Sequence, residues 1–229
     1  MEKGYQMCSL SVMDTIADPD ITFDEKGICN YYYDYQQRAK LRLFNDEANS
    51  HRLPDIVDQI KKAGKGNEYD CLIGVSGGVD STYVAYKVKE LGLRPLAIHF
   101  DNGWNSGLAV KNIEKTLNKL QIDLFTYVID WEGFKSLQLA FLRASTPDGE
   151  IPTDHAIFAL LFKVASEKGI RHIINGNNFA TEFVMPPTWS YGHIDWQYIK
   201  TINRLFGERT LKDYPHLTPL KYFYYTFKK

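Results

Sequence analysis

The sequence of 229 residues has few cysteines, no long apolar run and no excess of basic charge. The three cysteines, Cys8, Cys29 and Cys71, are too few and too scattered for a disulfide framework, which favours a reducing compartment. No apolar run approaches the roughly 18 residues that a membrane span needs, and the amino-terminal residues lack the pattern of a signal peptide. We therefore expect a cytoplasmic protein that does not interact with membranes.

The charge balance excludes one class of partner. Lys and Arg together number 27 and Asp and Glu 28, so the chain lacks the basic excess on which counterion-driven nucleic-acid binding depends. We expect no nucleic-acid partner. Hydrophobic residues make up 44% of the chain, which is enough for an ordinary buried core.

Apolar runs of strand length alternate with helical patterns along most of the chain. The pattern predicts a short amphipathic helix over 53–62, strands over 71–75, 95–100, 124–129 and 171–174, and helices over 79–90, 107–120, 132–144 and 154–168. This alternation is typical of an α/β fold, an open parallel sheet with helices on both faces. We expect an amino-terminal appendage over 1–50 and a nucleotide-binding domain over 51–229.

The strongest motif follows the first predicted strand and opens the first helix of the domain. Its residues are Ser76, Gly77, Gly78, Val79, Asp80 and Ser81. Backbone N–H groups and the helix dipole converge on an anion at such a turn, and glycine lets the backbone approach it closely. Asp80 would repel a bare polyphosphate, so its carboxylate indicates a bridging Mg²⁺. The alternative is a plain strand-to-helix turn in which these residues only cap the helix.

At these residues the sequence resembles the PP-loop ATP pyrophosphatases, the adenine nucleotide alpha hydrolase-like fold, which include NAD, GMP and asparagine synthetases. No Walker-type glycine-rich loop is present. The resemblance implies that ATP is cleaved at the α-phosphorus, that pyrophosphate leaves into the loop and that the substrate is adenylated. It also implies nucleotide contacts at Phe100 and Asn102, after the second strand, and at Gly176, after the last. Glu182 is a further acidic candidate. A turn or helix cap is the alternative at each position.

Several further segments resemble a narrower family, the N-acetyl sugar amidotransferases of surface-polysaccharide synthesis. They are 11–15, 18–24, 27–30, 101–105, 150–155 and 176–182. The resemblance implies that the N-acetyl group of a nucleotide-linked or acidic sugar is adenylated on its oxygen and converted to an acetamidino group, a step in lipopolysaccharide or O-antigen biosynthesis. It also implies a separate glutaminase or synthase subunit that supplies ammonia, since nothing in this chain resembles a glutaminase.

Asp154 and His155 begin a predicted helix near the mouth of the sheet. A carboxylate and an imidazole there could orient ammonia or accept a proton, so we predict them, with Asp80 and Glu182, as catalytic residues. The alternative is that Thr153 or Asp154 caps the helix and His155 packs against the loop. Segment 185–192 contains aromatic residues that could face a sugar ring, and a packed, proline-stiffened loop is equally compatible with it.

The chain departs from the narrower family at both ends. Relatives carry two C-x2-C pairs suited to Zn²⁺, whereas the corresponding residues here are Cys8, Ser11, Cys29 and Tyr32. We therefore expect no metal at these positions, with aromatic packing of Tyr31–Tyr35 in its place. The chain also stops near Lys229, where relatives continue into a helical region, so we expect it to lack that region.

Three other functions are compatible with the phosphate motif. They are a different PP-loop ligase, a tRNA-thiolating enzyme and a nucleotide-binding subunit without catalysis. Sulfur transfer usually needs a reactive cysteine near the nucleotide, and Cys71 lies in a predicted buried strand. The sequence leaves open whether this chain forms a homo-oligomer.

Overall fold

The computed structural model describes residues 4–44, 46–182, 186, 189 and 192–227. The chain forms two compact units. The first comprises 1–52 together with 177–191, and the second comprises 53–176 together with 192–229. Segment 177–191, which lies within the domain predicted over 51–229, therefore belongs with the appendage.

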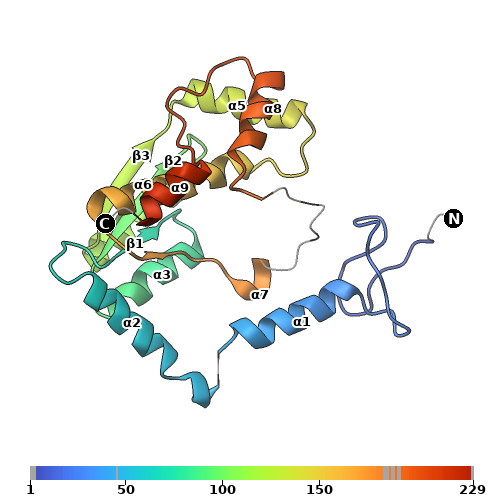
Figure 1. The fold of residues 1–229 in the computed structure, drawn as a ribbon, viewed down its shortest axis with the longest axis horizontal. Coiled ribbons are helices and arrows are strands. Elements are labelled where there is room, and N and C mark those ends of the chain that lie inside the picture. Colours follow the sequence, from blue (N-terminus) through green and yellow to red (C-terminus); the bar gives the residue numbers. More distant parts are fainter. Residues whose placement is uncertain (1–3, 45, 183–185, 187–188, 190–191, 228–229) are drawn as a thin grey trace. The chain divides into compact units, whose positions relative to one another are not determined.

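The second unit is built on a four-stranded parallel sheet in the order β3-β2-β1-β4 (Figure 1). The strands are β1 (Cys71–Gly74), β2 (Pro95–Asp101), β3 (Asp123–Val128) and β4 (Ile173–Ile174). β1 lies between β2 and β4 and is almost fully buried, which explains its continuous apolar run. This confirms the predicted open parallel α/β sheet.

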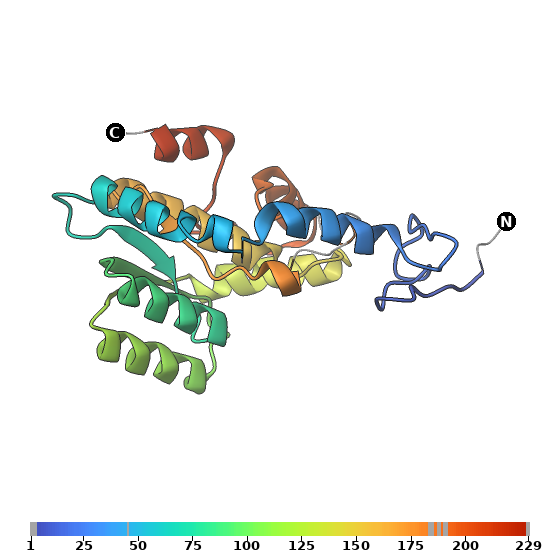
Figure 2. The ribbon, with the colours of Figure 1, turned by 90° about the horizontal axis from the view of Figure 1, so that it is seen from below.

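Helices cover both faces of the sheet, as predicted. The helices of this unit are α2 (Arg52–Ala63), α3 (Val79–Glu90), α4 (Gly107–Leu120), α5 (Trp131–Arg143), α6 (Ile151–Lys168), α8 (Trp196–Phe206) and α9 (Pro219–Phe227). α3 and α4 lie on one side of the sheet and α6 on the other (Figure 2). Because neighbouring residues of a strand face opposite sides, Leu72 joins the core with α5, α6 and α8, whereas Cys71 and Ile73 join the core with α2, α3 and α4.

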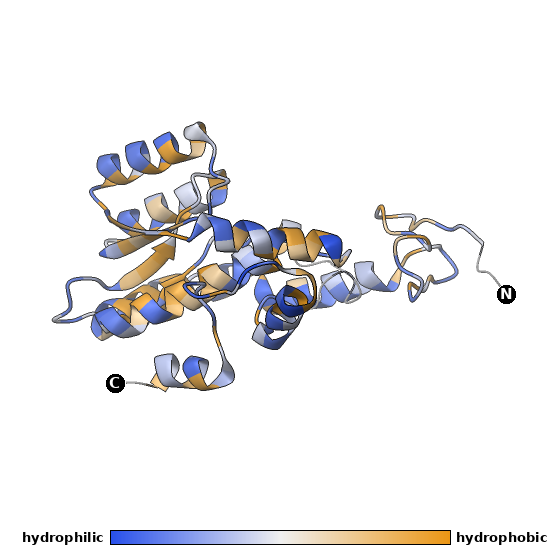
Figure 3. Cartoon of the chain, turned by 90° about the horizontal axis from the view of Figure 1, so that it is seen from above, coloured by the Kyte–Doolittle hydropathy of each residue, from blue (hydrophilic) through white to orange (hydrophobic). Residues whose placement is uncertain are grey.

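Apolar residues concentrate on the strands and on the sheet-facing sides of these helices (Figure 3). The bounds of α3 and α4 agree with the prediction, whereas α6 begins at Ile151 rather than at Asp154. Pro152 lies in the first turn of α6, where a missing backbone N–H costs nothing. Among the described residues, no helix combines the length and the apolar character that crossing a membrane requires.

The first unit contains α1 (Asn30–Arg42), a 3₁₀ turn (Glu47–Asn49) and the short α7 (Phe179–Glu182). Its small core consists of Cys8, Met13, Ile21 and Cys29, with Tyr31 and Tyr32 packed against it. The Cys29 N–H donates to Cys8 Sγ at 3.2 Å, and Ser11 Oγ lies 3.7 Å from Cys29 Sγ. Two tyrosine rings thus pack beside the buried cysteines of this core. No cluster of three or more potential metal ligands occurs among the described residues.

Candidate functional site

The strand order places the phosphate motif at the point where the chain reverses its direction of sheet growth. From β1 the chain adds β2 and then β3 on one side, and it later returns to add β4 on the other side. In open parallel sheets, ligands usually bind beside such a point, at the carboxyl ends of the two central strands. The motif follows β1 and Gly176 follows β4.

Two serine hydroxyls close the loop between β1 and α3. Ser81 Oγ accepts the Ser76 N–H at 3.2 Å and lies 3.2 Å from Ser76 Oγ. Ser81 Oγ also donates to the Gly78 carbonyl at 3.2 Å, and Ser76 Oγ accepts the Gly78 N–H at 3.4 Å. The loop is therefore shaped by its own short polar side chains before any ligand binds.

Gly77 is required by both its conformation and its surroundings. Its φ is +79°, a value that residues with a side chain rarely adopt, and a Cβ there would lie 2.4 Å from the Ala109 carbonyl oxygen. Asn112 Nδ2 donates to the Gly77 carbonyl at 3.3 Å. The first turns of α4 thus hold the loop in place, and neither Ala109 nor Asn112 was recognised from the sequence, because nothing in their spacing indicates this contact.

The amino terminus of α3, like those of α1 and α6, has no side-chain cap, and it differs in this from α4, α5 and α8. In those helices a side-chain oxygen of Ser106, Asp130 or Asp195 accepts a first-turn backbone N–H. At α3 the N-cap is Gly78, and no side chain in the described part of the chain caps it. The first-turn N–H groups of α3 are therefore available to an anion, as a phosphate-binding helix requires.

Asp80 and Gly176 lie next to the amino terminus of α3. Asp80 lies exposed in the first turn of α3, beside the exposed Val79. A Cβ on Gly176 would lie 3.3 Å from the Asp80 carbonyl carbon and 3.4 Å from the Ser81 nitrogen. The structure therefore brings Gly176 against the phosphate motif, and a larger residue there would press on the first turn of α3.

The residues predicted after the second strand have other partners. Phe100 is buried in the core, stacked on Tyr127 with ring centroids 6.1 Å apart. Asn102 Oδ1 accepts the Trp104 N–H at 3.1 Å and shapes the turn that follows β2. The part of the Asn102 side chain left to a ligand is its amide nitrogen.

Asp154 and His155 lie in the first turn of α6 but differ in exposure. Asp154 Oδ2 lies 3.1 Å from His193 Nδ1, an ion-pair distance without hydrogen-bond alignment. Burial raises the pKa of Asp154 above its ordinary value, and the nearby His193 opposes that shift. A half-exposed carboxyl group with a raised pKa can accept a proton.

His155 is fully buried and both of its ring nitrogens have partners. Nδ1 lies 2.7 Å from the His193 carbonyl oxygen, and Nε2 lies 3.0 Å from the Leu217 nitrogen, so the neutral ring donates through Nδ1 and accepts through Nε2. The ring lies nearly parallel to those of Trp196 and Tyr214, with ring centroids 6.0 and 6.2 Å away. We call these residues the His155 corner. In this arrangement His155 connects the backbones at His193 and Leu217, and its predicted catalytic role stays a prediction.

Glu182 belongs to the first unit, where it ends α7 and accepts the Asn178 N–H at 3.1 Å. Of segment 185–192, residues 185, 187, 188, 190 and 191 lie outside the described residues. Trp189 Nε1 donates to the Ala17 carbonyl at 2.8 Å within the same unit. The predicted roles of Glu182 and of this aromatic segment stay predictions.

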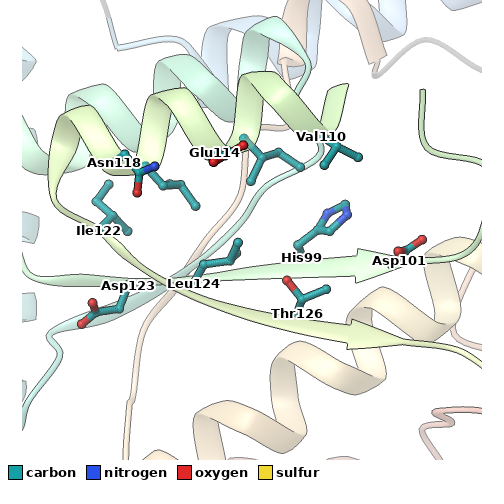
Figure 4. A pocket seen from close by; sticks show the side chains of 11 residues that line it. His99, Asp101, Val110, Glu114, Asn118, Ile122, Asp123, Leu124 and Thr126 are labelled. Atoms are coloured by element: carbon teal, nitrogen blue, oxygen red, sulfur yellow. The ribbon is translucent and has the colours of Figure 1, made fainter. Parts of the chain in front are cut away.

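A cavity of about 490 Å³ opens between α4 and strands β2 and β3 (Figure 4). His99, whose Nδ1 lies 3.0 Å from the Val75 carbonyl oxygen, forms part of its wall. The lining also includes the carboxylates of Asp101, Glu114 and Asp123, which disfavour a polyphosphate. A polyphosphate is therefore disfavoured in this cavity.

No protein-family model and no curated protein sequence matches this chain. Solved structures are similar to it at low identity. They include the NMN synthetase of Francisella tularensis, with 19% identity over 55% of this chain and 52% of that one and a TM-score of 0.40. The NH3-dependent NAD synthetase of Campylobacter jejuni is 17% identical over 66% of this chain and 70% of that one, with a TM-score of 0.44.

The glutamine-dependent NAD+ synthetase of Acinetobacter baumannii, solved with ADP, is 12% identical over 72% of this chain and 33% of that one, with a TM-score of 0.45. The present chain thus spans about half of the first of these proteins and a third of the last. At these identities and TM-scores, chemistry has to be argued from the residues of this chain.

Proposed function

We propose that this chain is an ATP-dependent amidotransferase that adenylates the N-acetyl oxygen of an acetamido sugar and replaces that oxygen with nitrogen from ammonia. The observation that carries the proposal is the uncapped amino terminus of α3. It follows β1 at the switch point, and the Ser76 and Ser81 hydroxyls close its loop. Such a site binds a phosphate chain through backbone N–H groups.

Adenylation explains why ATP is needed. The amide oxygen attacks the α-phosphorus, the bond from the α-phosphorus to the bridging oxygen of the β-phosphate breaks, and pyrophosphate leaves. Ammonia then adds to the activated carbon, a proton is lost, and AMP departs with the former amide oxygen to give the acetamidino group. In this scheme the first turn of α3 and its serine loop bind the pyrophosphate portion of ATP, where negative charge accumulates.

The residues around the loop suit Mg²⁺ when ATP is present. The Asp80 carboxylate is exposed on the first turn of α3, and carboxylate, hydroxyl and phosphate oxygens are the ligands that Mg²⁺ prefers. Bound there with ATP, Mg²⁺ would neutralise phosphate charge. Without it, Asp80 would repel the phosphate chain that the rest of the loop attracts.

Asp154 is the residue that we propose as proton acceptor for the incoming nitrogen. Its pKa is raised by burial, which brings it closer to working pH, and its carboxyl group stays half-exposed next to His193. His155 is a positioning residue in this proposal, because both of its nitrogens are engaged by backbone groups. A separate glutaminase subunit would supply ammonia, and the cytoplasm, which supplies ATP, is the proposed compartment.

The acceptor is proposed from the resemblance of six segments to N-acetyl sugar amidotransferases. The decisive experiment measures pyrophosphate release by the full chain with ATP, Mg²⁺ and ammonium, with and without a panel of UDP-linked acetamido sugars. We expect release that depends on the sugar, with a product about one dalton lighter than the starting sugar, as replacing O by NH requires. Release without any acceptor, or release that depends instead on tRNA or on a carboxylic acid, would contradict the proposed substrate.

The role of Asp80 has a matched control within the chain. Asp80→Ala should lower pyrophosphate release by about 100-fold or more, the size of effect usual when one electrostatic contact is removed from a transition state. Asp55 also lies exposed in the first turn of a helix, α2, so Asp55→Ala should leave the rate unchanged. Equal rates for the two variants would show that α3 does not bind the reacting phosphates.

A further inference from the structure

The edge strand β3 has both an apolar surface and an open side. It pairs with β2, and no described strand pairs with its other side. The exposed fractions of Leu124, Phe125 and Val128 are 43%, 41% and 69%. Leu124 and Thr126 point toward α4 along one wall of the cavity (Figure 4). β3 thus presents large apolar side chains to solvent on both faces.

The hydrogen-bonding direction of the backbone shows which groups are free at this edge. The Ile129 N–H donates to the Asp101 carbonyl of β2 at 3.1 Å. In a parallel ladder, alternate residues of a strand direct their backbone groups to opposite sides. Phe125 and Tyr127, two and four residues before Ile129, therefore direct their backbone N–H and C=O groups to β2. Leu124, Thr126 and Val128 direct theirs to the open side.

β3 lacks the usual protection of an exposed edge. Natural sheets blunt such edges with lysine, proline or bulges, and among the six residues of β3 the charged one is Asp123, at the amino end. The remaining residues, Leu124–Val128, have high strand propensity. A strand of this composition favours pairing with another strand at its open side.

We propose that β3 pairs antiparallel with β3 of a second copy of this chain, with Thr126 opposite Thr126 on the two-fold axis. A two-fold axis perpendicular to the sheet keeps each face on its own side, so directly opposite residues come from the same face. This register places Leu124 opposite Val128 on the face toward α4. On the other face it places Phe125 opposite Tyr127.

The pairing satisfies both the side chains and the backbone. Apolar residues meet apolar ones, the aromatic rings meet each other, and threonine meets threonine, which are favourable cross-strand pairs. Leu124, Thr126 and Val128 all lie opposite residues whose backbone groups also face outward, which gives about six new hydrogen bonds, two for each hydrogen-bonded pair.

Charge favours this register and a second copy as the partner. Asp123 lies opposite Ile129, so the two Asp123 carboxylates lie at opposite ends of the paired strands. A shift by one residue in each copy would place Phe125 opposite itself, Leu124 opposite Thr126 and Asp123 opposite Tyr127, which loses the apolar match. A strand that is complementary to its own reversed sequence is matched most simply by another copy of itself.

Engineered cysteines test both the dimer and its register. In the proposed pairing the Thr126 Cα atoms lie about 5.5 Å apart, within the span of a disulfide. Thr126→Cys should therefore form a covalent dimer under mild oxidation, seen on a non-reducing gel. In Leu124→Cys the two new thiols would be about 13 Å apart along the strands, so this variant should stay monomeric on the gel. The wild-type chain, whose three cysteines are buried, is the background control.

A second measurement does not depend on cross-linking. The wild-type chain should have the mass of a dimer by light scattering, and Thr126→Lys should have the mass of a monomer, because two like charges would meet on the axis. Circular dichroism checks that this variant is folded. A monomeric wild-type chain, an open-ended series of oligomers or a dimer that Thr126→Lys leaves intact would overturn the proposal. Cross-linking of Leu124→Cys in place of Thr126→Cys would overturn the register.

Discussion

The phosphate loop and the His155 corner both contain residues predicted to act on substrate, but the loop is exposed and the corner is buried. At the loop, Ser76 is exposed and the first turn of α3 has no side-chain cap. In the His155 corner the imidazole is fully buried and hydrogen-bonded through both nitrogens. Position near the mouth of the sheet therefore does not identify a reactive group. Groups that can still form a hydrogen bond to a ligand are the better indication of a reactive site.

Substitution of Gly77 gives the largest effect that this comparison predicts. In Gly77→Ala the new methyl group would meet the Ala109 carbonyl oxygen, and the residue would be strained at φ +79°. We expect the free energy of unfolding to fall by about 3 kcal/mol and ATP affinity to fall with it. Thermal melting and calorimetric titration with ATP would measure both.

Gly78→Ala is the matched control for Gly77→Ala. Gly78 has a φ of −80°, and the nearest atom to a new Cβ is Ser76 Oγ at 3.4 Å, which is ordinary contact. This variant should keep most of its stability. If both variants bound ATP as tightly as the wild type, the loop would not be the nucleotide site.

His155→Gln tests whether the His155 corner is structural. Glutamine does not place a donor and an acceptor at the positions of the two ring nitrogens, so the His193 carbonyl or the Leu217 N–H loses its partner. We expect stability to fall by about 2 kcal/mol, the cost of a buried polar group left without its partner. Activity per folded molecule should change little. A large drop in kcat at unchanged melting temperature would instead support the predicted catalytic role.

The His155 corner should also make stability depend on pH. Burial lowers the pKa of His155, and the same cause lowers that of His216. As pH falls below about 6.5, these histidines take up protons in the unfolded chain before they do so in the folded one, so stability decreases toward acid. Thermal melting across this range should show the decrease, and His155→Gln should reduce its slope.

The smallest predicted effect concerns a buried polar group in the other unit. Burial raises the pKa of the Cys8 thiol, but hydrogen bonds from Ser11 and from the Leu10 and Cys29 N–H groups outweigh it and lower the pKa from 9.0 to about 7. The ultraviolet absorbance of the thiolate should therefore titrate near neutral pH. Ser11→Ala should move that midpoint upward, and Ser9→Ala, at an exposed neighbouring serine, should leave it in place.

The sheet could be predicted from the sequence because its signals are local. β1 is a continuous apolar run, and α3 and α4 have clear beginnings and ends, so their bounds agree with the prediction. α1 was missed because none of its residues is buried, which leaves no apolar periodicity to recognise. α8 and α9 went unpredicted as well, although the amphipathic pattern of α8 that packs on α5 is visible once its bounds are known.

The candidate site was predictable only in part. The phosphate motif is contiguous, so its residue types and their place after a strand were enough to recognise it. The partners of His155 come from positions 38 and 62 residues further along the chain, and the contact that requires glycine at position 77 comes from Ala109. Only the folded chain shows that one histidine is engaged and one glycine is indispensable.

The packing of Gly77 against α4 has a consequence for motion. The loop is held on one side by the Ala109 carbonyl and the Asn112 amide, so a nucleotide that immobilises the loop must also restrain the first turns of α4. Those turns border the cavity beside β3. Nucleotide occupancy should therefore slow amide hydrogen exchange in α4, at residues that touch no phosphate, and couple the phosphate loop to the edge of the sheet.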